Sequence, residues 1–283
     1  MDGYAVSQLL NDPLFLLQII AALGTTGFIA GVLAGLLGVG GGIVIVPVLY
    51  FLFQLFGTSA DVAMHVAVGT SLATIIGTSI SSVRSHHKKG GVDWLLLKRW
   101  APGVVIGVMA GTILAAFLKG QVLTIMFSIL ALFVAIQMLL SKVGGHLSEG
   151  LPGQPLEFIC AFIIGSISVM VGIGGGSISV PILTAFNYPI RKAVASASGF
   201  GLIIAVPGAI GFMISGWGTE GLPVGSIGYV NLLGFGLIVP MTVACAPLGA
   251  KIAHSVNPQY LKKGFAVFLF VTSLKMMYSA LGL

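Results

Sequence analysis

The chain has 283 residues, of which 57% are hydrophobic and only 7% are charged. Because a soluble domain carries roughly 25% charged residues, this composition excludes a water-soluble globular protein and indicates that lipid covers most of the surface. The net charge of +6 does not indicate nucleic-acid binding, because the basic residues lie in short loops between hydrophobic runs, where they report membrane topology.

The hydrophobic runs predict an all-α integral membrane protein. Helices and closed barrels satisfy every backbone group in a bilayer, but barrel strands alternate apolar and polar residues, whereas these runs are continuous. A spanning helix needs about 20 apolar residues. We expect about ten hydrophobic segments, eight full spans and two short or broken ones, over residues 14–37, 43–56, 62–83, 100–118, 121–140, 157–171, 177–186, 193–215, 229–253 and 261–281.

The second and seventh segments are the short ones. Each follows a glycine cluster directly and contains one proline, Pro47 or Pro181. Because proline removes a helical hydrogen bond, we expect Pro47 and Pro181 to mark helix breaks, and the two segments to be half-spans or broken helices.

The two halves of the chain repeat each other. The glycine clusters at 38–42 and 172–176 match at an offset of 134, and near the end of each half the offset becomes 138, as for Pro102 with Pro240 and Gly111 with Gly249. The repeated unit holds five segments, so the second copy should enter the membrane from the opposite side. We therefore expect a first inverted repeat over residues 1–143, a connecting loop over 144–156 and a second inverted repeat over 157–283.

The basic residues give an independent topology. If the segments cross the membrane alternately, one side of the membrane has only Lys119, and Lys275 lies within the last segment. The other side has Arg84, Lys88, Lys89, Lys98, Arg99, Lys142, Arg191, Lys192, Lys251, Lys262 and Lys263. Because positive loops stay in the cytoplasm, we expect the side with these eleven residues to be the cytoplasmic side of the cell (inner) membrane, and both termini to lie on the outer side.

The paired glycine clusters are the leading candidate for a substrate site. Glycine lets a ligand approach backbone N–H groups, and a run of such groups at a helix start binds anions. Inverted-repeat transporters place substrates where broken helices present their ends. The alternative is close helix packing, which also uses glycine in membranes. The predicted substrate-binding residues here are Gly38, Gly40, Gly41, Gly42, Gly172, Gly174, Gly175, Gly176 and Ser177.

A small polar patch follows each short segment. Residues 67–71, which end in Thr70 and Ser71, align with residues 195–199, which contain Ser196 and Ser198, if a six-residue gap is allowed. These four hydroxyls could donate to substrate oxygens, or they could bond back to their own helix. We find no nucleotide-binding, metal-binding or catalytic pattern, so no cofactor, metal or enzymatic activity is expected.

The run from Gly31 to Gly42, followed by Val46-Pro47 and by Gly69-Thr70-Ser71, resembles the sulfite exporter TauE/SafE family. The second cluster, 172–176 with Val180-Pro181, fits the same family. The second copy departs by having Ala197-Ser198-Gly199 in place of Gly-Thr-Ser. The resemblance covers nearly the whole chain and implies secondary transport of sulfite, organosulfonates or related sulfur-containing anions, usually as export.

The sequence thus predicts a secondary transporter that moves a small anion across the inner or plasma membrane by alternating access. Its partners would be the anionic substrate and the lipid bilayer, without nucleic acid, and a homo-oligomer is left open. A passive anion channel and a cation-coupled importer of a sulfur-containing anion remain alternatives.

Overall fold

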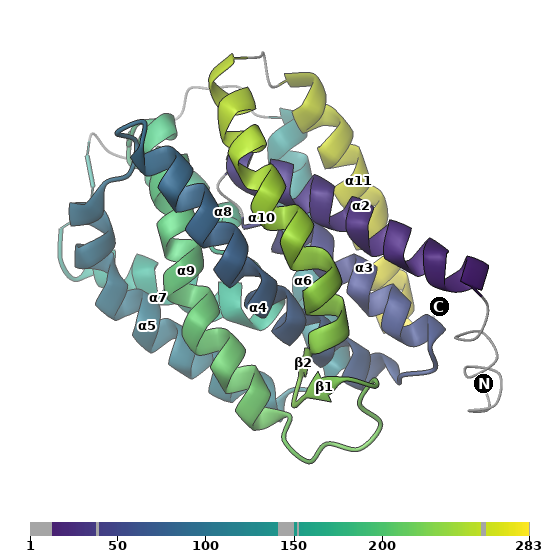
Figure 1. Cartoon of the computed structure of the whole chain (residues 1–283). Helices are drawn as coiled ribbons and strands as arrows, with labels where there is room; N and C mark the ends of the chain where they lie inside the picture. Colours follow the sequence, from purple (N-terminus) through teal and green to yellow (C-terminus); the bar gives the residue numbers. More distant parts are fainter. Residues whose placement is uncertain (1–12, 38–39, 141–149, 152, 256–258, 283) are drawn as a thin grey trace.

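The computed structural model describes residues 13–37, 40–140, 150–151, 153–255 and 259–282 (Figure 1). Within these ranges it contains ten helices and one pair of two-residue strands, β1 (Ser226–Ile227) and β2 (Val230–Asn231). The helices are α2 (Pro13–Leu37), α3 (Gly42–Leu55), α4 (Ala60–His87), α5 (Trp94–Phe117), α6 (Gly120–Leu140), α7 (Leu156–Val171), α8 (Gly176–Ala185), α9 (Ile190–Ser215), α10 (Leu232–Ser255) and α11 (Gln259–Leu281).

The all-α prediction is confirmed, but the number of full spans is corrected. Seven of the described helices are long and apolar enough to cross a membrane, and α3, α7 and α8 are shorter. Eight spans and two short segments were expected. The difference is α7, whose 16 residues extend about 24 Å at 1.5 Å per residue, less than the roughly 30 Å of a bilayer core.

Helices α4 and α9 form the centre of the bundle and pack against each other. The most apolar window of α4 is 78% buried inside the protein, compared with 33% for the windows of α10 and α11. Around this centre, α2 packs along α10, α5 packs along α7, and α6 packs along α11 (Figure 1). The outer helices therefore have lipid on one face, while α4 is mostly enclosed by protein and the window of α9 is 56% buried.

Glycine residues allow the backbones of the paired outer helices to approach each other closely. A Cβ added at Gly111 in α5 would lie 2.5 Å from the carbonyl oxygen of Ser166 in α7. A Cβ added at Gly249 in α10 would overlap the carbonyl of Val32 in α2. Small residues let helix backbones meet in this way in membranes, where packing rather than water exclusion holds helices together.

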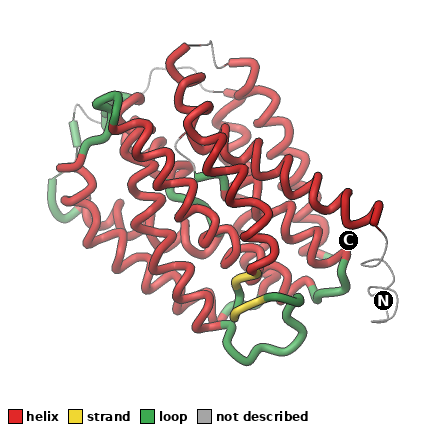
Figure 2. The backbone as a smooth tube through the Cα atoms, in the orientation of Figure 1, coloured by secondary structure: helices red, strands yellow, loops and turns green. Residues whose placement is uncertain are grey.

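Helices α7 and α8 form a hairpin rather than two successive crossings. Just before α7, the Gly150 N–H donates to the Phe186 carbonyl at the end of α8, with a distance of 3.3 Å. The connection between the two helices is a short loop in the middle of the bundle (Figure 2). The chain therefore turns around at the second glycine cluster and returns to the end of the bundle from which α7 starts.

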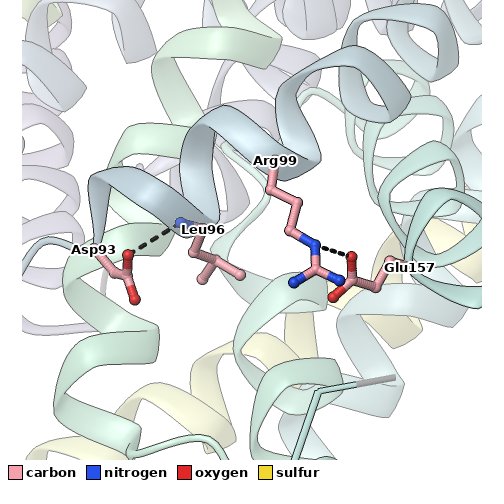
Figure 3. A network of polar contacts seen from close by, with 4 residues as sticks. All are labelled: Asp93, Leu96, Arg99 and Glu157. Atoms are coloured by element: carbon pink, nitrogen blue, oxygen red, sulfur yellow. Dashed lines mark hydrogen bonds and ion pairs between the residues drawn. The ribbon is translucent and has the colours of Figure 1, made fainter. Parts of the chain in front are cut away.

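An ion pair fastens this end of the hairpin. Arg99, in the second turn of α5, points toward Glu157 at the start of α7, with 2.5 Å between Nε and Oε2 (Figure 3). Glu157 is only 1% exposed, and a buried carboxylate without a partner would be very costly. The pair thus fixes the register of α7 on α5.

We predict that Gly249→Val destabilises the protein by about 2 kcal/mol or more, because overpacking at a backbone contact forces the helices apart. Gly111→Val should behave similarly. Gly236→Val on α10 is the control, since nothing lies within 4 Å of its added Cβ. Melting followed by tryptophan fluorescence in detergent would measure the effect. Equal melting temperatures for the Gly249 and Gly236 variants would contradict glycine-controlled packing.

Candidate functional site

The two glycine clusters contact each other in the buried interior. A Cβ added at Gly40 would lie 3.1 Å from the Cα of Gly174, and one added at Gly42 would overlap the carbonyl oxygen of Gly172. All glycines of the two clusters that the structure describes are buried. Gly38, also predicted as a site residue, lies outside the described residues. Neither cluster has room for a side chain where the two meet.

Each cluster ends at the start of a short helix. Gly41 precedes α3 with φ 79°, and Gly175 precedes α8 with φ 78°, a left-handed conformation that favours glycine. Neither glycine can cap its helix with a side chain, so the first N–H groups, on Gly42 and Gly176 and the residues after them, have no capping side chain. Two helix N-termini, each carrying a partial positive charge, therefore begin beside the contact between the clusters.

The prolines lie inside the short helices. Pro47 is within α3 and Pro181 is within α8, and both helices continue past them. The interruptions of the helical chain therefore fall at the glycine clusters, ahead of the prolines.

The four predicted hydroxyls have different surroundings. Ser71 of α4 donates to the carbonyl of Gly172, at 2.8 Å, and so lies at the contact between the clusters. Ser198 of α9 donates to Ala195 in its own helix, at 2.6 Å. Thus Ser71 belongs to the glycine site, whereas the hydroxyl proton of Ser198 is already used within α9.

Thr70 and Ser196 hold the chain at the two ends of the bundle. The Thr70 hydroxyl accepts from the N–H of Asn231, at 2.8 Å, just before α10. The Ser196 hydroxyl accepts from the N–H of Asp93, at 3.0 Å, just before α5. Each hydroxyl on a central helix therefore anchors the residue that begins an outer helix.

Several buried hydroxyls near the clusters have no hydrogen-bond partner in the described structure. Ser177, in the first turn of α8, is one of them, and Ser79 of α4 is another. A Cβ added at Gly201 of α9 would lie 2.5 Å from the Ser79 Oγ and 3.0 Å from the Gly174 carbonyl oxygen. Ser79 is therefore next to the second cluster. The hydroxyls of Ser82, Ser168 and Ser179 are also buried without a hydrogen-bond partner in the described structure.

Sequence reasoning predicted Ser177 but missed Ser79. A signal existed, since α4 carries Thr74, Thr78, Ser79 and Ser82 inside an otherwise apolar span. A buried hydroxyl without a partner costs free energy. Such a group in a native protein calls for an explanation, such as a functional role or a bound water or ion.

The nearest neighbours of the cluster glycines are uncharged. For a Cβ added at Gly40, Gly41, Gly42, Gly172 or Gly175, the three nearest atoms in the described chain all belong to uncharged residues. Among the described residues, no three histidine, cysteine or carboxylate side chains gather as a metal site. The site therefore offers backbone dipoles and hydroxyl groups as its polar contacts.

Asp93 connects the short hairpin to the start of α5. Its Oδ1 accepts from the N–H groups of Leu95 and Leu96, each at 3.0 Å (Figure 3 shows the bond from Leu96), and its Oδ2 accepts from the Tyr188 hydroxyl at 2.6 Å. The bond from Tyr188 and then that from Leu96 lower the pKa of the Asp93 carboxyl. Burial, followed by the bond to Asp93, raises the pKa of the Tyr188 phenol.

The model of the family described as "Sulfite exporter TauE/SafE" matches residues 23–276, which is most of the chain. The chain belongs to the sulfite exporter TauE/SafE family. It is thus a multi-pass membrane protein of a transporter family, not of an enzyme family.

Relatives named as probable membrane transporter proteins support this assignment. The chain is similar to one from Haemophilus influenzae, with 34% identity over 88% of this chain and 95% of the relative. Another, from Methanocaldococcus jannaschii, is 31% identical over 92% of this chain and 96% of the relative. A Bacillus subtilis relative, YunE, is 27% identical over 90% and 96%. No solved structure matches the chain.

We predict that Asp93→Asn lowers the stability of this TauE/SafE-family transporter at pH 7 by about 1 kcal/mol, because hydrogen bonds to a charged acceptor are stronger than those to an amide. The folded-state pKa of Asp93 is below its ordinary value of 3.8. The stabilisation is therefore present above about pH 4 and is lost as the pH falls through the folded-state pKa.

Melting temperatures between pH 3 and pH 7 would measure this difference. Tyr188→Phe removes the strongest donor to Asp93 and should reduce the same pH dependence. If the difference in melting temperature between wild type and Asp93→Asn stays constant from pH 3 to pH 7, the ionised Asp93 carboxylate is not the source of the stabilisation.

Proposed function

We propose that this protein is a secondary transporter that moves a small sulfur oxyanion or organosulfonate across the cell membrane by alternating access. The observation that carries the proposal is the contact between the two buried glycine clusters, where α3 and α8 begin. Membership of the sulfite exporter family supports the sulfur-containing substrate.

An anion in this position would lose most of its hydration and would need several donors, because an unpaired charge in an apolar medium is very costly. The first N–H groups of α3 and α8 are suited to this role, since each helix start lacks a side-chain cap. The hydroxyls of Ser177 and Ser79 are buried and have no other partner in the described structure. Dipoles and hydroxyls hold an anion without a fixed opposite charge, which suits release as well as binding.

The proposal includes two inverted repeats, over residues 1–143 and 157–283, and recurring contacts support them. Gly111 meets the Ser166 carbonyl, while Gly249 meets that of Val32. Gly111 and Gly249 are 138 residues apart, and Val32 and Ser166 are 134 apart, the two offsets of the sequence repeat. One half thus uses equivalent residues to contact the other, as a two-fold relation between the halves requires.

The anchors of the outer helices recur in the same way. Asp93 and Asn231 are 138 residues apart, and their N–H groups donate to Ser196 and Thr70. These contacts support the pairing of Thr70 with Ser196, an offset of 126, over the pairing of Thr70 with Ser198 that the sequence alignment suggested. The hydroxyl of Ser71 then has Ala197 as its counterpart, so the two halves of the site are not chemically identical.

Rocking of one half against the other would open the cluster contact to each side of the membrane in turn. The positions of the described carboxylates favour transport driven by the gradient of the anion itself. They do not favour coupling to a cation that acidic side chains would bind. Asp61 accepts from the Gly120 N–H, Asp93 caps α5, and Glu157 pairs with Arg99. Glu220, in the loop before β1, is exposed.

We predict that Ser177→Ala and Ser79→Ala each raise the KM for sulfite about tenfold in a proteoliposome flux assay. A hydrogen bond to a charged group contributes about 1.5–3 kcal/mol, and 1.4 kcal/mol is a factor of ten. Both variants should melt at or above the wild-type temperature, because an unpartnered hydroxyl is removed.

Ser198→Ala is the matched control, since its hydroxyl already donates within α9, and its KM should equal that of the wild type. Substituting valine for Gly41 or Gly175 is a weaker test, because their positive φ makes any side chain strained. If both serine variants fold well and keep the wild-type KM, the substrate does not bind at the clusters.

The topology is tested separately. We predict that a single cysteine substituted at Gly90 is protected from an impermeant thiol reagent in intact cells, whereas one substituted at Gly221 is labelled. The reason is that the side of the membrane with most of the Lys and Arg residues, where Gly90 lies, should be cytoplasmic. The free Cys160 and Cys245 are first replaced. Nothing lies within 4 Å of an added Cβ at either glycine, and both have a positive φ, so the two cysteine variants carry the same kind of backbone strain and remain comparable. Labelling of Gly90→Cys as fast as Gly221→Cys would overturn the proposed orientation and the external termini.

A further inference from the structure

A pocket of about 420 Å³ lies between the ends of α4 and α10, and none of the cluster glycines that the structure describes is among its lining residues. Its lining includes four cationic side chains, Arg84, Lys88 and Lys89 from the end of α4 and Lys251 from α10. None of the lining residues that the structure describes is acidic. The sequence also has no acidic residue between Asp61 and Asp93, nor any after Glu220.

This arrangement concentrates positive charge from two helices in one concave space. The like charges of these basic side chains repel one another, and an anion bound between them would offset the repulsion. The pocket volume is within the range of about 300–1,000 Å³ found for small-ligand sites.

The remaining lining is apolar toward the middle of the bundle. Gly77 and Ile80 of α4, with Val243 and Pro247 of α10, extend the pocket away from the cations. Ser81 donates to the Val243 carbonyl, at 2.9 Å, and so joins α4 to α10 at this level. From Lys88 to Gly77 the pocket follows about 16 Å of α4 at 1.5 Å per residue. A charged mouth with an apolar inner wall suits a ligand with an oxyanion group and a less polar portion.

We infer that this pocket is a second oxyanion-binding site, separate from the glycine clusters and independent of the proposed function. Its ligand is a phosphate, sulfate or sulfonate group, carried either by an anionic phospholipid or by a free small anion. Basic pockets between membrane helices bind lipid headgroups in this way, and Arg and Lys are the usual partners of such groups.

The test uses the full-length protein in phosphatidylcholine nanodiscs, with two arms. In one arm phosphatidylglycerol replaces part of the phosphatidylcholine, and bound lipid is counted by native mass spectrometry. In the other arm sodium sulfate is titrated at constant ionic strength, and binding is followed by the rise in melting temperature. Wild-type protein should bind in at least one arm, the first identifying a lipid headgroup and the second a free anion.

Arg84→Gln/Lys88→Gln should weaken that binding at least tenfold, and Lys251→Gln alone should weaken it measurably, because both helices contribute. The matched control is Lys98→Gln/Arg191→Gln, which removes two exposed charges at the same end but outside the pocket, and it should bind like the wild type. Because Lys251 lies on the other helix, its variant keeps the test valid if the double variant does not fold. No binding in either arm, or equal losses in the pocket and control variants, would overturn the site.

Discussion

A helix that breaks inside a membrane exposes backbone N–H and C=O groups that lipid cannot satisfy. This protein breaks its chain twice at glycine clusters, and it places the two breaks against each other within the bundle. Most other features follow from that constraint. The enclosing helices must shield the breaks from lipid, which explains why α4 and α9, the helices beside them, have the largest buried shares among the seven candidate membrane spans.

The outer helices are held by backbone contact. Gly111 and Gly249 bring α5 against α7 and α10 against α2, so that each helix preceding a break is fixed by an uninterrupted partner. The ion pair of Arg99 with Glu157 adds register at one end. Within this frame the two broken helices bring polar backbone together at the cluster contact, where none of the nearest described neighbours of the cluster glycines is a charged residue.

The two proposed repeats share some contacts and differ in others. Ser196 and Thr70 play the same anchoring role at opposite ends of the bundle. By contrast, the partner residues before the outer helices are Asp93 at one end and Asn231 at the other, and only Asp93 receives a bond from a tyrosine hydroxyl. The basic pocket at the ends of α4 and α10 is a further local difference, because the loop 216–228 at the opposite end has no basic residue.

The sequence by itself determined the membrane class and most of the helical segments, and it located the two glycine clusters, because hydrophobic length and clustered glycine are local properties of the chain. It also predicted Ser177 and Ser71 at the site. It did not separate Ser198, bonded within its own helix, from Ser71, bonded across to Gly172, since both are serines on central helices.

Tertiary structure decided the rest. It decided that α7 and α8 form a hairpin, that Ser79 lies beside the second cluster, and that Thr70 and Ser196 accept from the backbone N–H groups just before α10 and α5. It also gathered Arg84 and Lys251 into one pocket, although they are far apart in the chain. These features depend on which helix faces meet across the bundle, and packing in a membrane, where lipid is as apolar as the side chains, leaves little trace of those partners in the hydrophobic pattern.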